Sequence, residues 1–213
     1  MAITHEVVKR WVCDFAGEIA ENKQMLTKLD SAIGDGDHGT NMDRGMQAVV
    51  TKLEDVSGDD VGGLLKTVGM TLVSKIGGAG GPLYGTFFIQ MGTATAGKTD
   101  ITAEDWSAAL DSGVNGVQAR GKAELEDKTM LDALIPAREA FKEALEAGAS
   151  FQESLERSAQ AADEGMKATI PLVARKGRAS YLGERSAGHQ DPGATSSHML
   201  MRTAAQALAQ GTS

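Results

Sequence analysis

Apolar residues recur at helical spacing along almost the whole of this 213-residue chain. In the first such stretch, one face of a helix collects Val7, Val8, Trp11, Val12, Phe15 and Ile19. No stretch shows the alternation of apolar and polar residues that is typical of a strand. The sequence therefore predicts an all-α fold of eight or nine helices, over residues 7–19, 23–29, 42–53, 61–76, 82–95, 102–117, 130–145, 150–170 and 194–209.

Several boundaries of these helices are marked by residue type. Thr102, ahead of Asp105, is typical of a helix N-cap, and Ser150 predicts another helix start. Pro136 falls inside a helical stretch and predicts a kink there, because proline removes one backbone hydrogen bond. No internal repeat or linker separates these segments, so residues 1–213 are expected to form a single domain.

The charge balance limits the classes of partner. The chain carries 21 basic and 29 acidic residues, a net charge of −8, which argues against broad binding to nucleic acid or to an anionic membrane. No run of apolar residues is long enough to cross a membrane, and the N-terminus does not resemble a signal peptide. Cys13 is the single cysteine, so no internal disulfide can form, and we expect a cytoplasmic protein.

Glycine is unusually frequent: 26 of the 213 residues are glycine, about 12%, against an average of about 7%. The glycines concentrate in three predicted loops, 33–39, 76–85 and 176–193, each followed by a predicted helix. Helix N-termini present free N–H groups and the positive end of the helix dipole. Three such loops make an anion site at one end of a helical bundle plausible.

The first loop is also the most acidic. Asp30, Asp35 and Asp37 lie within eight residues, and carboxylates at that density repel one another unless a cation compensates them. Hard oxygen ligands in a tight loop suggest Mg²⁺. The alternative is a solvated turn, since Asp and Gly are ordinary turn residues. A calcium EF-hand is excluded, because Met46 occupies the position that requires a bidentate glutamate.

The other two glycine loops allow two interpretations each. Gly77–Gly81 could bring backbone N–H groups close to a phosphate, or could only let two helices cross. The third loop carries four basic side chains suited to phosphate oxygens, or to a solvated basic surface: Arg175, Lys176, Arg178 and Arg185.

A phosphate-binding P-loop pattern also occurs, at Gly92–Thr99. That pattern binds phosphate between a strand and a helix, whereas here the preceding segment is predicted to be helical and Gly97 to end it. We therefore expect no P-loop at this position.

Together, six blocks in this order and spacing resemble the L-subunit family of bacterial dihydroxyacetone kinase, and the resemblance covers essentially the whole chain. The blocks are Asp30 with Gly34–Met42, Gly77–Leu83, Arg120–Ala123, Asp127–Met130, Arg175–Arg185 and Gly188–Ala194.

The resemblance implies an eight-helix up-and-down barrel that holds a nucleotide and two Mg²⁺ ions in loops at one end. It implies three metal ligands, Asp30, Asp35 and Asp37. It implies a nucleotide site in which Arg178 stabilises the phosphates and no residue is a covalent nucleophile. The implied nucleotide contacts are His38, Gly39, Thr40, Asn41, Ala79, Gly80, Gly121, Met130, Arg178, Asp191, Pro192 and Gly193.

One departure from the family's pattern concerns position 80. Gly80 stands where relatives often have serine, so a hydroxyl contact to phosphate would be missing there.

The charges of the implied ligands are consistent with two metals. Three carboxylates and ADP bring about −6 and two Mg²⁺ return +4, leaving about −2 for Arg178, helix dipoles and amides to offset.

The function implied by the resemblance is phosphoryl transfer on tightly bound ADP. A phosphohistidine carrier subunit of the phosphotransferase system would rephosphorylate the ADP, and the phosphoryl group would pass to dihydroxyacetone on a separate K subunit. Two alternatives remain open. One is an ATP-dependent kinase subunit for dihydroxyacetone or another small ketose, and the other is a nucleotide-state sensor that binds a transcription regulator.

Overall fold

Helices account for most of residues 2–210, which the computed structural model describes. The all-α prediction is confirmed: the only strands in this range, β1 (Ile3–Thr4) and β2 (Asp100–Ile101), form a two-residue antiparallel pair with Ile3 opposite Ile101. The helices are α1 (His5–Glu21), α2 (Lys23–Ile33), α3 (His38–Glu54), α4 (Val61–Lys75), α5 (Gly80–Ala94), α6 (Ala103–Gly121), α7 (Leu131–Glu146), α8 (Phe151–Ala168), the 3₁₀-helix η1 (Arg178–Ser186) and α9 (Pro192–Gln210).

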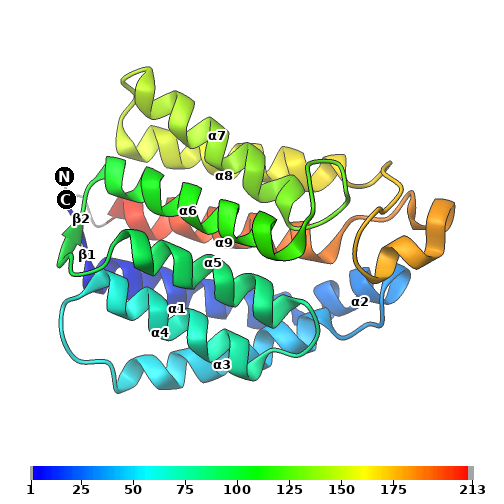
Figure 1. Ribbon diagram of the computed structural model, residues 1–213, viewed down its shortest axis with the longest axis horizontal. Helices are drawn as coiled ribbons and strands as arrows, with labels where there is room; N and C mark the ends of the chain where they lie inside the picture. The colour runs from blue at the N-terminus through cyan, green and yellow to red at the C-terminus, as the bar shows by residue number, and fades with distance from the viewer. Residues whose placement is uncertain (1, 211–213) are drawn as a thin grey trace.

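Eight of the helices form a closed ring. Going round it, α1, α3, α4, α5, α6, α7, α8 and α9 each pack against the next, and α9 packs back against α1. Neighbours in the ring run in opposite directions, and α2 lies outside the ring beside the start of α3 (Figure 1). The ring therefore has the up-and-down order implied by the sequence resemblance, with α2 as an additional ninth helix.

The ring encloses one hydrophobic core, and Trp11 of α1 lies within it. Its ring centroid is 5.1 Å from that of Trp106 and 5.7 Å from that of Phe88, so α1, α5 and α6 meet through aromatic contacts. The indole N–H of Trp11 donates to the carbonyl of Leu200 at 3.1 Å, which ties α1 to α9 and closes the ring. No helix within residues 2–210 is long and apolar enough to span a membrane.

Local signals explain where several helices begin. Thr102 and Asp105 form a complete capping box at the start of α6, and the Ser150 hydroxyl accepts from the N–H of Glu153 at the start of α8, both as predicted. Pro136 lies within α7. Its missing N–H leaves the carbonyl of Asp132 without a donor in its own helix.

Two predicted loops are shorter than expected. Helix α2 continues to Ile33 rather than ending near residue 29, so Asp30 lies on its last turn and only residues 34–37 form the loop. The extra turn forms because Ile33, one heptad after Leu26, is buried against Ala174 and Ala179. The predicted loop 176–193 likewise contains η1, because Ala179 packs on Ile33.

Helices α4 and α5 approach almost to backbone contact at two pairs of glycines. A Cβ atom on Gly69 would lie 2.6 Å from the carbonyl oxygen of Gly85, and one on Gly92 would lie 2.6 Å from that of Gly62. Real Cβ atoms do not approach so closely, so the two helices would have to separate. This contact sets the position of α5, whose first turn faces the opposite end of the ring from Gly92.

We expect Gly69→Ala to lower the free energy of unfolding by about 1–3 kcal/mol, as overpacking in a core does. The matched control is Gly17→Ala on α1, where a new Cβ meets nothing within 4 Å. Alanine is a better helix former than glycine by about 1 kcal/mol, so the control should be neutral or stabilising. Urea unfolding of both variants measures the difference; equal effects would contradict the close α4–α5 contact.

Candidate functional site

The direction of the ring helices places four helix N-termini at one end. Helices α3, α5, α7 and α9 all begin at the end that carries the glycine loops, and α1 begins and α9 ends at the other (Figure 1). At the glycine-loop end the structure has a cavity of about 420 Å³. This volume is within the usual range for small-molecule sites, about 300–1,000 Å³.

Three carboxylates meet at one side of the cavity. One oxygen each from Asp30, Asp35 and Asp37 lies within 4.8 Å of the others, with Asp30 buried and the other two exposed. Gly36 makes the turn between Asp35 and Asp37 with a φ of 72°, a left-handed conformation that favours glycine. Three hard oxygen ligands at this separation fit a divalent cation such as Mg²⁺.

Asp30 also builds the loop that carries its two partners. Its Oδ2 accepts hydrogen bonds from the backbone N–H groups of Asp37 at 2.8 Å and His38 at 3.1 Å. Neither N–H group has a hydrogen-bond partner within α3, because both lie at its start. The Asp30 carboxylate accepts from them, as the side chain of an N-cap residue does in other helices. The Oδ1 atom of Asp30 makes no hydrogen bond with the described residues and remains for a cation.

Side-chain capping differs between the two ends of the ring. At the end without the cavity, Asp60, Thr102 and Ser150 each cap a helix by accepting from a backbone N–H, at the starts of α4, α6 and α8. At the cavity end Asp191 caps α9 in the same way, and the Thr129 hydroxyl accepts from the first N–H of α7. No N-cap side chain accepts from α3 or α5, so the cavity meets two helix starts whose donors are left for a ligand.

Four backbone N–H groups in the first turns of α3 and α5 have no hydrogen-bond partner within residues 2–210; they belong to Gly39, Thr40, Gly80 and Gly81. Pro82 follows directly, at a position of the first turn where a missing N–H costs nothing. Free donors together with the positive ends of two helix dipoles favour an anion such as phosphate.

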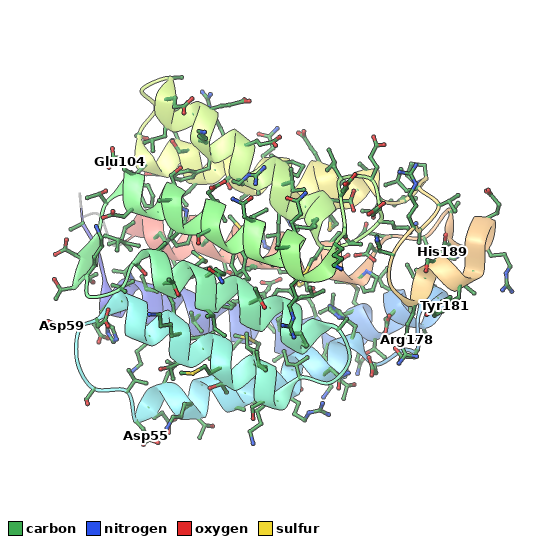
Figure 2. All side chains as sticks on the ribbon, viewed as in Figure 1. Asp55, Asp59, Glu104, Arg178, Tyr181 and His189 are labelled. Atoms are coloured by element: carbon green, nitrogen blue, oxygen red, sulfur yellow. The ribbon has the colours of Figure 1, made fainter. Side chains whose placement is uncertain are left out.

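Arg178 adds an exposed positive charge. Its guanidinium lies 3.0 Å from a carboxylate oxygen of Asp35, and its side chain is 67% exposed. Exposed ion pairs of this kind contribute little stability, so the guanidinium is free to turn towards a phosphate. Figure 2 shows Arg178, Tyr181 and His189 at this end of the molecule, opposite Asp59 and Glu104.

A polar network that the sequence did not reveal lies beneath the carboxylates. The Nε2 atom of His38 is 2.9 Å from the hydroxyl of Ser196, which is 2.7 Å from that of Tyr84. Burial lowers the pKa of His38 and raises the pKa of Tyr84 to about 12, so both are neutral near pH 7. The network joins the starts of α3, α5 and α9. No motif signals it, because the two residues of each hydrogen-bonded pair are more than a hundred residues apart.

The other side of the cavity is apolar. Leu83, Val117, Met130 and Leu131 line it, with the backbone of Gly121 beside them. An apolar surface of this kind suits an aromatic ring, whereas the carboxylates and free N–H groups suit a charged group. The cavity therefore fits a ligand with an aromatic part and an anionic part.

Asp191 stands directly before α9 and is buried. Its Oδ2 accepts from the N–H of Ala194 at 2.7 Å, and its own N–H donates to the hydroxyl of Thr169 at 3.0 Å. Burial raises the pKa of Asp191 to about 7, although the Ala194 hydrogen bond and the Lys128 charge act in the opposite direction.

Thirteen of the fifteen candidate residues line the cavity. The two that do not are Gly39, which packs against the backbone of Lys23 on α2, and Thr40, whose side chain is exposed. A ligand in the cavity could therefore meet these two residues only through their backbone. The P-loop pattern ends α5 at the opposite end of the ring, and Gly97 follows that helix with a φ of 74°, as expected.

Comparison with known proteins gives one consistent family. The DAK2 domain matches residues 32–206 of this chain. The chain is 44% identical, over 97% of its length and 99% of the relative, to a protein of Escherichia coli strain K12 described as the ADP-binding subunit DhaL of PEP-dependent dihydroxyacetone kinase. It is 42% identical, over 97% of its length and all of the relative, to the corresponding subunit of the PTS-dependent kinase of Lactococcus lactis.

The fold also matches a solved structure. The dihydroxyacetone kinase from C. freundii in complex with AMP-PNP and Mg²⁺ aligns with a TM-score of 0.70 and 24% identity. The alignment covers 96% of this chain and 33% of that longer chain. The same helical fold therefore recurs as about a third of a larger protein.

The two roles of Asp30 can be separated from those of its neighbours. We expect Asp30→Ala and Asp35→Ala both to weaken Mn²⁺ binding, measured by titration with Mn²⁺ as a probe for Mg²⁺. Only Asp30→Ala should also lower the free energy of unfolding, by about 1–3 kcal/mol, because it leaves two backbone N–H groups without their acceptor. Asp59→Ala in the loop at the far end is the control; unchanged Mn²⁺ affinity in both site variants would contradict the metal assignment.

The raised pKa of Asp191 makes stability depend on pH. The unfolded carboxyl titrates near 3.8 and the folded one near 7, so between these values the folded state binds more protons. The free energy of unfolding of the metal-free protein should therefore fall as the pH rises from about 4 to about 7. Asp191→Asn should flatten this part of the pH dependence in urea unfolding, whereas the same slope in the variant would show that Asp191 titrates normally.

Proposed function

This chain belongs to the DAK2 domain family, and we propose that it is the ADP-binding, phosphoryl-transferring subunit of a phosphotransferase-system-dependent dihydroxyacetone kinase. The observation that carries the proposal is the pairing of a carboxylate cluster with free helix N-termini at one cavity. Carboxylates alone would repel a nucleotide, and free N–H groups alone would attract any anion. Together they select a phosphate group that arrives with divalent cations.

Two Mg²⁺ ions fit the charge of the site better than one. Asp30, Asp35 and Asp37 contribute −3 and ADP about −3, so two ions leave about −2 and one ion about −4. The three aspartates would hold the ions, and the ions would neutralise and orient phosphate oxygens. The remaining charge faces the starts of α3 and α5 and the guanidinium of Arg178.

The rest of the cavity matches the other parts of ADP. The N–H groups of Gly39, Thr40 and Gly80 would donate to phosphate oxygens, so the absence of a hydroxyl at position 80 is compensated by the backbone. The apolar surface near Gly121 and Met130 would border the base and sugar. His38, Asn41 and Ala79 would line the phosphate side, and Asp191, Pro192 and Gly193 would close the cavity at the start of α9.

This chain's residues would catalyse by positioning and by charge. No residue of the cavity is assigned as a covalent nucleophile, and phosphoryl transfer relies mainly on alignment and neutralisation of charge. When bound, ADP would accept the phosphoryl group of a phosphohistidine carrier subunit and make it available to dihydroxyacetone held on a K subunit. Asp30 fixes the loop of metal ligands, and Arg178, which pairs with Asp35, would stabilise the charge of the phosphates.

The experiment that tests this function is to purify the protein, denature it and identify the released nucleotide. We expect about one ADP per chain, and we expect added labelled ATP not to exchange with it before denaturation. Asp35→Ala should be purified without nucleotide, because the phosphates then lack part of their compensating cations. The Asp59→Ala variant should retain ADP.

Other outcomes of the nucleotide-exchange and phosphoryl-transfer measurements would indicate other functions. Ready exchange with labelled ATP would indicate an ATP-dependent kinase subunit for dihydroxyacetone or another small ketose. Absence of phosphoryl transfer to any ketone with all partners present, together with retained binding of a transcription regulator, would indicate a nucleotide-state sensor. Absence of any Mg²⁺-dependent nucleotide binding would contradict the proposal.

A further inference from the structure

Lys128 is buried in a cage of backbone carbonyls. It is 1% exposed, and its Nζ atom donates to the carbonyl oxygens of His189 at 2.6 Å, Thr169 at 2.8 Å and Leu172 at 3.0 Å. Lysine is almost never fully buried unless its charge is compensated. Here the compensation comes from carbonyl dipoles that follow the C-terminal end of α8, where a cation is favourable.

The geometry excludes a direct contact between this ammonium group and a ligand. An ammonium group has three N–H donors, and Lys128 directs three hydrogen bonds of 2.6–3.0 Å at backbone carbonyls. No donor is left for a phosphate. A role of this lysine in the site must therefore act through the backbone segments that it holds.

The loop that carries Lys128 has an unusual conformation. Three of its residues other than glycine have left-handed φ angles: Lys122 at 50°, Glu126 at 70° and Lys128 at 63°. Such conformations are unfavourable and persist only where surrounding contacts impose them. The carboxylate of Asp132 accepts from the N–H groups of Glu126 at 2.6 Å and Thr129 at 2.7 Å, and so fixes this loop from the first turn of α7.

The segments that Lys128 joins all lead into the cavity wall. Its own loop connects Gly121 to Met130, which line the apolar side. The turn at Thr169–Leu172 leads to the cavity residues 176–179, and His189 comes two residues before Asp191. One side chain therefore links three segments that continue into the cavity wall. The carboxylate cluster at 30–37 has its own anchor in the two hydrogen bonds of Asp30, and it meets the 174–179 stretch through Ile33 and Arg178.

We propose that Lys128 is a positioning residue that locks the 121–130 loop to the 169–191 segment, so that the wall on the base side and the start of α9 retain a bound nucleotide as one rigid unit. This inference rests on the proposed function, because it assumes that the ligand is a nucleotide. It assigns retention of the ligand to Lys128 and binding of the cations to the aspartates, so the two can be measured separately.

The test compares Lys128→Met with Lys122→Met, which removes a lysine charge from an exposed position of the same loop. We expect ADP to dissociate from Lys128→Met about 10- to 100-fold faster than from the unaltered protein, by analogy with the loss of an outer-shell contact at a metal site. Mn²⁺ affinity at the aspartates should be unchanged. Lys122→Met should release ADP at the unaltered rate.

A general loss of stability must be distinguished from loss of positioning. Leu155 is buried in the first half of α8 and does not line the cavity. Leu155→Ala should therefore lower stability without altering the contacts of Lys128, and should leave ADP dissociation unchanged. If Lys128→Met binds ADP as tightly as the unaltered protein, or if Leu155→Ala accelerates release equally, the positioning role is overturned. If the unaltered protein binds no nucleotide, the proposed function fails first.

Hydrogen exchange on the unaltered protein tests the same inference should Lys128→Met not fold. On addition of Mg²⁺ and ADP, amides of 122–130 and of 169–191 should gain protection together, because one cage holds both. Protection of one segment without the other would overturn the inference.

Discussion

The alternating direction of eight helices in a closed ring is the constraint on which the site depends. Alternation brings the starts of α3, α5, α7 and α9 to one end, and closure keeps them around one opening. Side-chain caps satisfy the starts of α4, α6 and α8 at the other end and of α9 at this one, so the unsatisfied donors are those of α3 and α5, beside the cavity. The close α4–α5 contact at glycines then fixes how far the first turn of α5 reaches into that opening.

The cavity end carries the groups that are costly to bury. Asp30, Lys128 and Asp191 are each less than 10% exposed, and each is compensated by backbone groups rather than by a paired side chain. Such charges hold irregular segments in place where helices cannot, because their hydrogen bonds reach several N–H or carbonyl groups at once. The apolar core around Trp11 supplies stability, and these charged anchors supply the shape of the site.

Sequence patterns predicted much of this structure because they report local properties. Helical spacing gave the all-α class, and Thr102 and Ser150 gave two helix starts. The cluster of Asp30, Asp35 and Asp37 was predictable because its members are neighbours in the chain. The carbonyl cage of Lys128 and the hydroxyl network of Tyr84 were not, because their partners are 41 to 113 residues away and backbone carbonyls leave no sequence signal.

The central claim is that carboxylates and free helix starts bind a phosphate group only together with divalent cations. Thermal unfolding of nucleotide-free protein tests it most directly, with Mg²⁺ alone, with ADP and a chelator, and with both Mg²⁺ and ADP. The account predicts a large rise in the unfolding midpoint only with both ligands. Mg²⁺ neutralises the carboxylates that would otherwise repel ADP, and the negative charge of ADP helps to hold Mg²⁺ in the site. An equal rise with ADP and the chelator would contradict it.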